Sequence, residues 1–242
     1  MAINRENSGY TIIYASVMVI IVALGLAFTH MGLKTQQVRN ENIDKMQQIL
    51  RSLNIDANNK VAEQQYNELI TNAYLIYADG QKVVGTEGVT PNDPAFSGEG
   101  VTGEIIPVFE AEVDGSKKYI LPMNGAGLWG AIWGYLAVES NGSTIYGAEF
   151  GHAGETPGLG AEIVNVDFRN QFIGKELIKN NEFKSVAVVK PGQSDTHRDY
   201  VDGISGGTIT SKGVGDMLFN SVKKYEIFLK NLHSDNQPTV GN

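Results

Sequence analysis

One short stretch near the C-terminus, Asp202-Gly-Ile-Ser-Gly-Gly-Thr208, brings an acid, two hydroxyls and three glycines together. We expect a closing helix to begin in this stretch. A helix N-terminus offers free backbone N–H groups and the positive end of the helix dipole, which together suit a phosphate. The same residues also have a purely structural interpretation, in which Ser205 is the helix N-cap and the glycines form a turn. Both interpretations place the two hydroxyls at the start of a helix.

The same stretch also contains the Gly-x-Ser-x-Gly pattern of serine hydrolases, at residues 203–207. That pattern requires a buried strand before the serine, whereas residues 195–200 are polar. The acid and histidine that follow, Asp216 and His233, lie too far apart on one expected helix to serve Ser205. A serine hydrolase therefore stays an alternative that the context does not favour.

A second candidate site is the loop Gly154-Glu-Thr-Pro-Gly-Leu-Gly160, which we expect to join a strand to a helix. Its glycines could bring backbone N–H groups close to a bound ring or phosphate, or could simply form a tight connection. A third candidate is the group Asp195, His197, Asp199 and Asp202, whose composition suits a metal ion. With no second histidine nearby, a solvated acidic loop explains this group better, and no metal is predicted.

Composition excludes several classes of protein. The 242 residues contain 27 Asp and Glu against 19 Lys and Arg, which gives a net charge of −8 and a pI near 5.0. A nucleic-acid-binding protein needs clustered surplus cations, and this chain has none. The absence of cysteine excludes disulfides, thiol nucleophiles and cysteine-ligated metal centres.

The N-terminus has the composition of a membrane span. Residues 7–33 contain no Asp, Glu, Lys or Arg, and about 20 apolar residues in a helix cross a bilayer. We predict an N-terminal segment at 1–9 and a transmembrane helix at 10–30. The apolar stretch is longer than that of a cleaved signal peptide, which favours an uncleaved anchor. The charges that flank the span weakly favour a cytoplasmic location for the rest of the chain.

The remaining residues mix helices with hairpins. A stripe of Ile43, Met46, Leu50 and Leu53 predicts an amphipathic helix inside a helical connector at 31–73, followed by a domain at 74–242. Turn signals at residues 79–80, 114–115 and 141–142 predict three antiparallel hairpins, and residues 87–103 read as a loop. We predict helices at 61–72, 161–179 and 208–232, and strands at 74–77 and 185–190. The mixed order indicates an α+β fold with a largely antiparallel sheet.

Together these features resemble a known family. The apolar segment is followed by Gly127-Leu-Trp-Gly130, then Val138-Glu139, then the loop at residues 154–160 and the stretch at 202–208. That order is similar to the C subunit of the bacterial Na⁺-translocating NADH:quinone oxidoreductase over nearly the whole chain. The last stretch matches the flavinylation motif Asp-x-x-Ser-Gly-x-Thr, which also marks the G subunit of the ferredoxin-linked electron-transport complexes. Gly207 stands where the family usually has alanine, a change that removes one methyl group.

The resemblance implies a covalent cofactor. FMN would be joined through its phosphate to the hydroxyl of Thr208, in a phosphoester bond that a separate flavin transferase installs. Ser205, Gly206 and Gly207 belong to the same motif, and amides there would face the remaining phosphate oxygens. The resemblance also assigns a set of residues to the surroundings of the flavin ring: Leu128, Trp129, Glu155, Thr156, Leu159 and Gly160.

The implied role is electron relay by a membrane-anchored flavoprotein. FMN would supply the redox chemistry, with no catalytic residue and no independent substrate turnover on this chain. The implied partners are the B, D and E subunits, with A and F in the same sodium-transporting NADH:quinone reductase of the bacterial inner membrane, and the family's flavin domain is periplasmic. The alternatives are the G subunit of a ferredoxin:NAD complex and an anchored binding domain without flavin.

Overall fold

The computed structural model describes residues 8–86, 88 and 104–235, and the chain divides into two compact units at residues 1–42 and 43–242. The first unit contains the N-terminal part of helix α1 (Ser8–Ser52), which includes the predicted span at 10–30. Among the described residues, α1 is the one helix whose length and composition allow it to cross a membrane. Most of the predicted N-terminal segment at 1–9, and the predicted loop at 87–103 apart from Gly88, lie outside the described residues.

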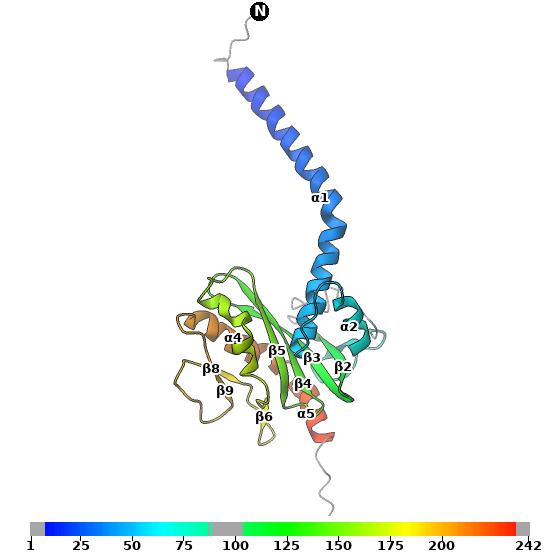
Figure 1. Cartoon of the computed structure of the whole chain (residues 1–242), viewed down its shortest axis with the longest axis vertical. Coiled ribbons are helices and arrows are strands. Elements are labelled where there is room, and N and C mark those ends of the chain that lie inside the picture. The colour runs from blue at the N-terminus through cyan, green and yellow to red at the C-terminus, as the bar shows by residue number, and fades with distance from the viewer. Residues whose placement is uncertain (1–7, 87, 89–103, 236–242) are drawn as a thin grey trace, which may run out of the picture. The chain divides into compact units, whose positions relative to one another are not determined.

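The second unit is built on a five-stranded antiparallel sheet whose strands follow one another in chain order (Figure 1). The strands are β1 (Ile70–Tyr77), β2 (Ile105–Val113), β3 (Ser116–Ala126), β4 (Ala131–Glu139) and β5 (Ile145–His152). The predicted hairpins at 114–115 and 141–142 are confirmed as the β2–β3 and β4–β5 connections. The predicted turn at 79–80 is present, and beyond it the described residues pair across an isolated antiparallel bridge between Ile76 and Lys82.

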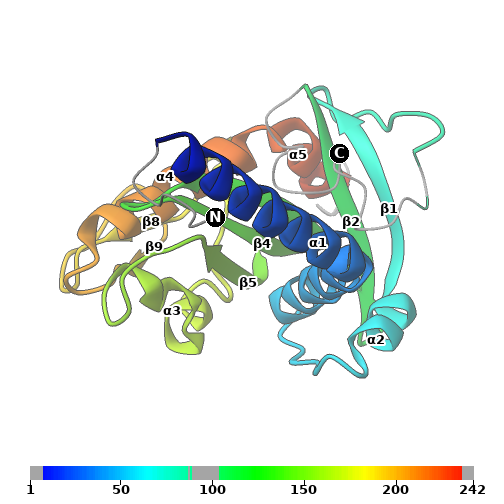
Figure 2. The same ribbon diagram turned by 90° about the horizontal axis from the view of Figure 1, so that it is seen from above.

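Helices cover both faces of this sheet. Helices α4 (Thr208–Lys223) and α5 (Glu226–Asp235) pack on one face, and α2 (Ala62–Leu69) packs on the other (Figure 2). The predicted apolar stripe contributes to the second face, where Leu50 and Leu53 of α1 are at most 1% exposed. Helix α2 ends three residues earlier than predicted because β1 already begins at Ile70. The α+β prediction is confirmed.

The predicted helix at 161–179 was wrong. The structure has a 3-10 helix η3 (Gly160–Val164), a short helix α3 (Val166–Asn170) and a strand β6 (Ile178–Lys179) that pairs with β7 (Glu182–Phe183). The extended backbone of Asn165 separates η3 from α3. The buried residues are Ile163, Phe168, Phe172 and Leu177, and their spacing does not follow one face of a helix.

The predicted helix at 208–232 is two helices. Helix α4 ends at Lys223, and α5 begins at Glu226 after a tight turn in which the Tyr225 N–H donates to the carbonyl of Val222. The Tyr225 side chain is fully buried, and its hydroxyl donates to the carbonyl of Pro107 on β2. This tertiary contact holds the break between the two helices against the sheet.

The predicted strand at 185–190 is confirmed over its middle part. Strand β8 (Ala187–Val189) pairs in parallel with β9 (Tyr200–Asp202), and the Gly203 N–H donates to the carbonyl of Val189 at 2.7 Å. The polypeptide then passes through residues 204–207 and enters α4 at Thr208. The β8–β9 pair therefore fixes the approach of the chain to the start of α4.

Candidate functional site

Three segments that are distant in sequence meet at the start of α4. They are the tip of the β3–β4 hairpin, the loop between β5 and η3, and the first turn of α4 itself. Together they enclose a cavity of about 220 Å³, called the loop cavity here, whose lining is Leu128, Glu155, Thr156, Leu159, Gly160, Gly206, Gly207, Thr208, Ile209 and Thr210. The structure thus brings together all the residues predicted for the site except Trp129 and Ser205.

The carboxylate of Glu155 links these three segments. Its side chain is buried, its Oε1 accepts the backbone N–H of Trp129 at 2.8 Å, and its Oε2 accepts the hydroxyl of Thr210 at 2.6 Å. Trp129 therefore enters the site through its backbone, while its ring is 69% exposed. Glu155 acts as the junction between the hairpin tip, the loop and the helix.

Hydrogen bonds keep Glu155 ionised. Burial by itself raises the pKa of a carboxyl group. Here the Thr210 hydroxyl, the N–H groups of Trp129 and Gly130, and the nearby His152 outweigh burial and lower the pKa of Glu155 below its usual value. The loop cavity consequently contains one fixed negative charge, whose oxygens are already occupied by donors.

Two glycines allow this close packing. A Cβ on Gly160 would lie 2.5 Å from both Oε2 of Glu155 and Oγ1 of Thr210, so a larger residue would disrupt their hydrogen bond. Gly206 has a φ of +76°, a left-handed backbone conformation that favours glycine, and its Cβ would lie 2.7 Å from Leu159. These contacts explain why the two motifs need glycine where the loop meets the helix.

The predicted capping role of Ser205 was wrong. Helix α4 begins at Thr208, its N-cap is Gly207, and the N-cap makes no side-chain hydrogen bond. Ser205 lies before the N-cap residue in the chain and is exposed. The buried hydroxyl of Ser211 instead accepts the N–H of Ile204 at 2.8 Å and holds the preceding turn from inside the helix.

Thr208 has an exposed side chain at the first residue of α4. The amides of the first helical turn have no acceptor within the helix, so they are available to a negatively charged group beside Thr208. Around the loop cavity several apolar side chains are exposed: Leu128 at 49%, Leu159 at 42% and Ile209 at 58%. The arrangement offers a hydroxyl for esterification next to an apolar surface suited to a flat ring.

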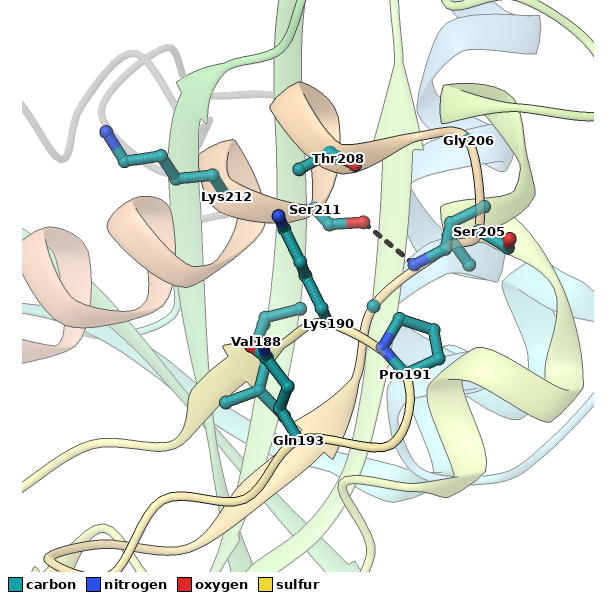
Figure 3. Close-up of a pocket in the computed structure, with 12 residues that line it drawn as sticks. Val188, Lys190, Pro191, Gln193, Ser205, Gly206, Thr208, Ser211 and Lys212 are labelled. Carbon is teal, nitrogen blue, oxygen red and sulfur yellow. Dashed lines mark hydrogen bonds between the residues drawn. The ribbon is translucent and has the colours of Figure 1, made fainter.

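A second cavity of about 550 Å³, called the lysine cavity here, lies beside the same turn (Figure 3). It shares Gly206 and Thr208 with the loop cavity, and Ser205 lines it. Its other lining residues include Lys190, Pro191 and Gln193 from the segment after β8 and Ser211 and Lys212 from α4. No local sequence pattern predicts these residues, because nothing local signals that β8 pairs with β9.

The acidic group considered as a metal site, Asp195, His197, Asp199 and Asp202, is engaged in other contacts. Asp195 pairs with Arg198, and Asp199 pairs with Lys179. Within the described ranges, no three His, Asp or Glu side chains are grouped closely enough to hold a metal ion.

The chain is similar to proteins of one kind. A family model described as an FMN-binding domain matches residues 127–223. The C subunit of the Na(+)-translocating NADH-quinone reductase of Vibrio vulnificus is 34% identical, covering 78% of this chain and 83% of its own. The corresponding protein of Pseudomonas aeruginosa is 30% identical, and the match covers 95% of this chain and 97% of that protein. The crystal structure of the C subunit from Parabacteroides distasonis superposes with a TM-score of 0.77 at 54% identity, covering 81% of this chain and 96% of that one.

Proposed function

Because the chain belongs to the family of C subunits of the Na(+)-translocating NADH-quinone reductases, we propose that it relays electrons through an FMN bound covalently to Thr208. Membership of this family makes the chain a flavoprotein component of an oxidoreductase complex, and the resemblance recognised in the sequence is confirmed. The covalent linkage, the membrane anchor and the partner subunits are the proposed parts of this function.

One observation carries the proposal for the linkage. The threonine of the Asp-x-x-Ser-Gly-x-Thr motif is the exposed first residue of α4 and borders both cavities. A phosphoester at its Oγ leaves the remaining phosphate oxygens close to unpaired backbone amides. The direct test is a denaturing gel of the chain made together with a flavin transferase, on which a flavin-fluorescent band is expected.

The residues of the loop cavity fit the rest of an FMN. Leu128, Leu159 and Ile209 supply exposed apolar surface for a ring, and Glu155 fixes the segments that carry them. When bound, FMN supplies the electron transfer, while the protein fixes its position and sets the surrounding charge. No acid–base residue or substrate turnover on this chain is part of the proposal.

The proposed setting is the complete complex. The B, D and E subunits are the proposed neighbours, A and F belong to the same assembly, and a flavin transferase attaches FMN to Thr208.

Helix α1 is the proposed membrane anchor, because its apolar window has a mean hydropathy of 2.5 and is not buried in the protein. Ion passage is left to the partners, since the predicted span at 10–30 contains no acid.

We predict that the second unit is periplasmic. A fluorescent protein that matures only in the cytoplasm, fused after Asn242, should be dark. The flanking charges are too weak an orienting signal to oppose translocation of a large domain. As a control, alkaline phosphatase fused at the same point should be active. A fluorescent first fusion together with an inactive phosphatase fusion would contradict this orientation.

The loop should contact the ring and not the phosphate. Leu159→Glu places a charge on a 42% exposed residue of the loop cavity, so it should shift the flavin absorption spectrum and reduction potential. Because Thr208 is unchanged, the flavin should stay attached on a denaturing gel. Ile227→Glu on α5, a similarly exposed apolar position that does not line the loop cavity, is the control. Unchanged spectrum and potential in Leu159→Glu would mean that the loop is only a connection.

A further inference from the structure

The two cavities beside Thr208 have opposite electrostatic character. The lysine cavity is lined by Lys190 and Lys212 and by no Asp or Glu. The loop cavity is lined by no Lys or Arg, and its one ionised group is the carboxylate of Glu155. This contrast occurs in a chain whose net charge is −8, so a cationic cavity is a local feature and not a consequence of overall composition.

We propose that Lys190 is the counter-charge for the flavin phosphate, so that the phosphate end of the cofactor faces the lysine cavity and the ring faces the loop cavity. The inference rests on the proposed attachment to Thr208, because Thr208 lines both cavities and carries the hydroxyl to which the phosphate would be joined. It adds a binding residue outside the flavinylation motif and gives each cavity a separate part of the ligand.

The backbone places Lys190 for this role. It follows directly after β8, whose Val189 pairs with Asp202 of β9 and accepts the N–H of Gly203 at 2.7 Å. The segment before Lys190 is therefore hydrogen-bonded to the strand that leads into the motif. The position of Lys190 relative to Thr208 therefore depends on backbone pairing as well as on its long side chain.

Side-chain direction separates the two lysines. Figure 3 shows Lys190 reaching from the end of β8 toward Ser211 and the first turn of α4, whereas Lys212 points away from that turn. In the part of the chain that the structure describes, neither lysine has an acidic partner within salt-bridge distance. Lys190 is thus an exposed cation that lines a cavity with Thr208 and points toward the first turn of α4, and Lys212 is a second cation of the same cavity that points away from that turn.

The chemistry fits a phosphate oxygen. A lysine ammonium is a compact point charge that makes charge-assisted hydrogen bonds with phosphate. A phosphate esterified at both ends retains one negative charge, which one lysine can balance. The loop cavity would place the same charge beside the ionised Glu155, where like charges repel.

The test compares wild type, Lys190→Gln and Lys212→Gln, each made as the full chain with and without a coexpressed flavin transferase. The quantity measured is the rise in Tm when flavin is attached, corrected for the Tm of the flavin-free form of the same variant. Lys190→Gln should reduce this rise by about 1–4 °C, and Lys212→Gln, whose side chain points away from the first turn of α4, should reduce it by less. The difference should shrink at high salt, because both groups are near solvent.

An equal rise in wild type and Lys190→Gln would overturn the role of Lys190 while leaving the attachment to Thr208 intact. Absence of covalent flavin from all three chains would instead contradict the proposed function. If only Lys190→Gln fails to attach flavin, Lys190→Arg decides: restored attachment supports a need for positive charge at this position, and continued failure contradicts it. The Tm of the flavin-free forms shows directly whether each variant folds.

Discussion

A Thr208→Ala chain coexpressed with a flavin transferase should give no fluorescent band on a denaturing gel, whereas the wild-type chain should give a strong one. Alanine has no oxygen with which to form the phosphoester, so the expected loss is complete. Because the Thr208 side chain is exposed, the unfolding free energy should change by about 0.5 kcal/mol or less. Loss of the band would therefore report attachment and not misfolding.

The neighbouring hydroxyls are matched controls for Thr208→Ala. Thr210 donates to Glu155, and Ser211 accepts the N–H of Ile204, so both are buried and already engaged. Ser205 is exposed but precedes the helix. Ser205→Ala, Thr210→Ala and Ser211→Ala should each keep at least part of the band. Fluorescence in denatured Thr208→Ala, or a tryptic peptide that carries FMN elsewhere, would refute the assignment.

Glu155→Gln should raise the reduction potential of the attached flavin by about 20–100 mV. Glu155 is ionised and only 5% exposed, so solvent screens its negative charge poorly and the charge opposes the arrival of electrons nearby. Glutamine keeps the size of the side chain and removes the charge. The potential is measured by redox titration of the flavin absorbance, with attachment to Thr208 checked on a gel.

Glu162→Gln is the control, because this carboxylate follows the same loop but lines neither cavity, and glutamine keeps an oxygen that can accept the N–H of Gly158. Its potential should stay close to that of wild type. Glu155→Ala should in addition lower the free energy of unfolding by about 1–3 kcal/mol, since the Trp129 N–H and the Thr210 hydroxyl lose their acceptor. A wild-type reduction potential in Glu155→Gln together with wild-type stability in Glu155→Ala would contradict the role assigned to Glu155.

Local patterns were sufficient for much of the fold. The charge-free stretch predicted the long N-terminal helix, and the stripe that includes Leu50 and Leu53 predicted which face of that helix is buried. The turn signals at 114–115 and 141–142 predicted two hairpins correctly. These features depend on residues only a few positions apart, for which helix periodicity and turn preferences are strong.

Predictions failed where a distant contact decided the outcome. Residues 161–179 have enough apolar side chains for a helix, but those side chains bury on the β5 side of the core at irregular spacing, and the chain follows them. Ser205 looked like a cap because serine is a preferred N-cap residue and stands shortly before the predicted helix start at Thr208. In the structure the cap position is Gly207, and the turn is held by Ser211.

For the candidate site, the sequence by itself determined the motif, the family and the threonine that begins the last helical segment. Only the tertiary structure decided that Glu155 joins the hairpin tip to Thr210, that two cavities meet at Thr208, and that Lys190 lines one of these cavities. The physical reason is that each of these depends on pairing between segments far apart in the chain, such as β8 with β9. No local preference of the residues involved specifies which distant segment they will meet.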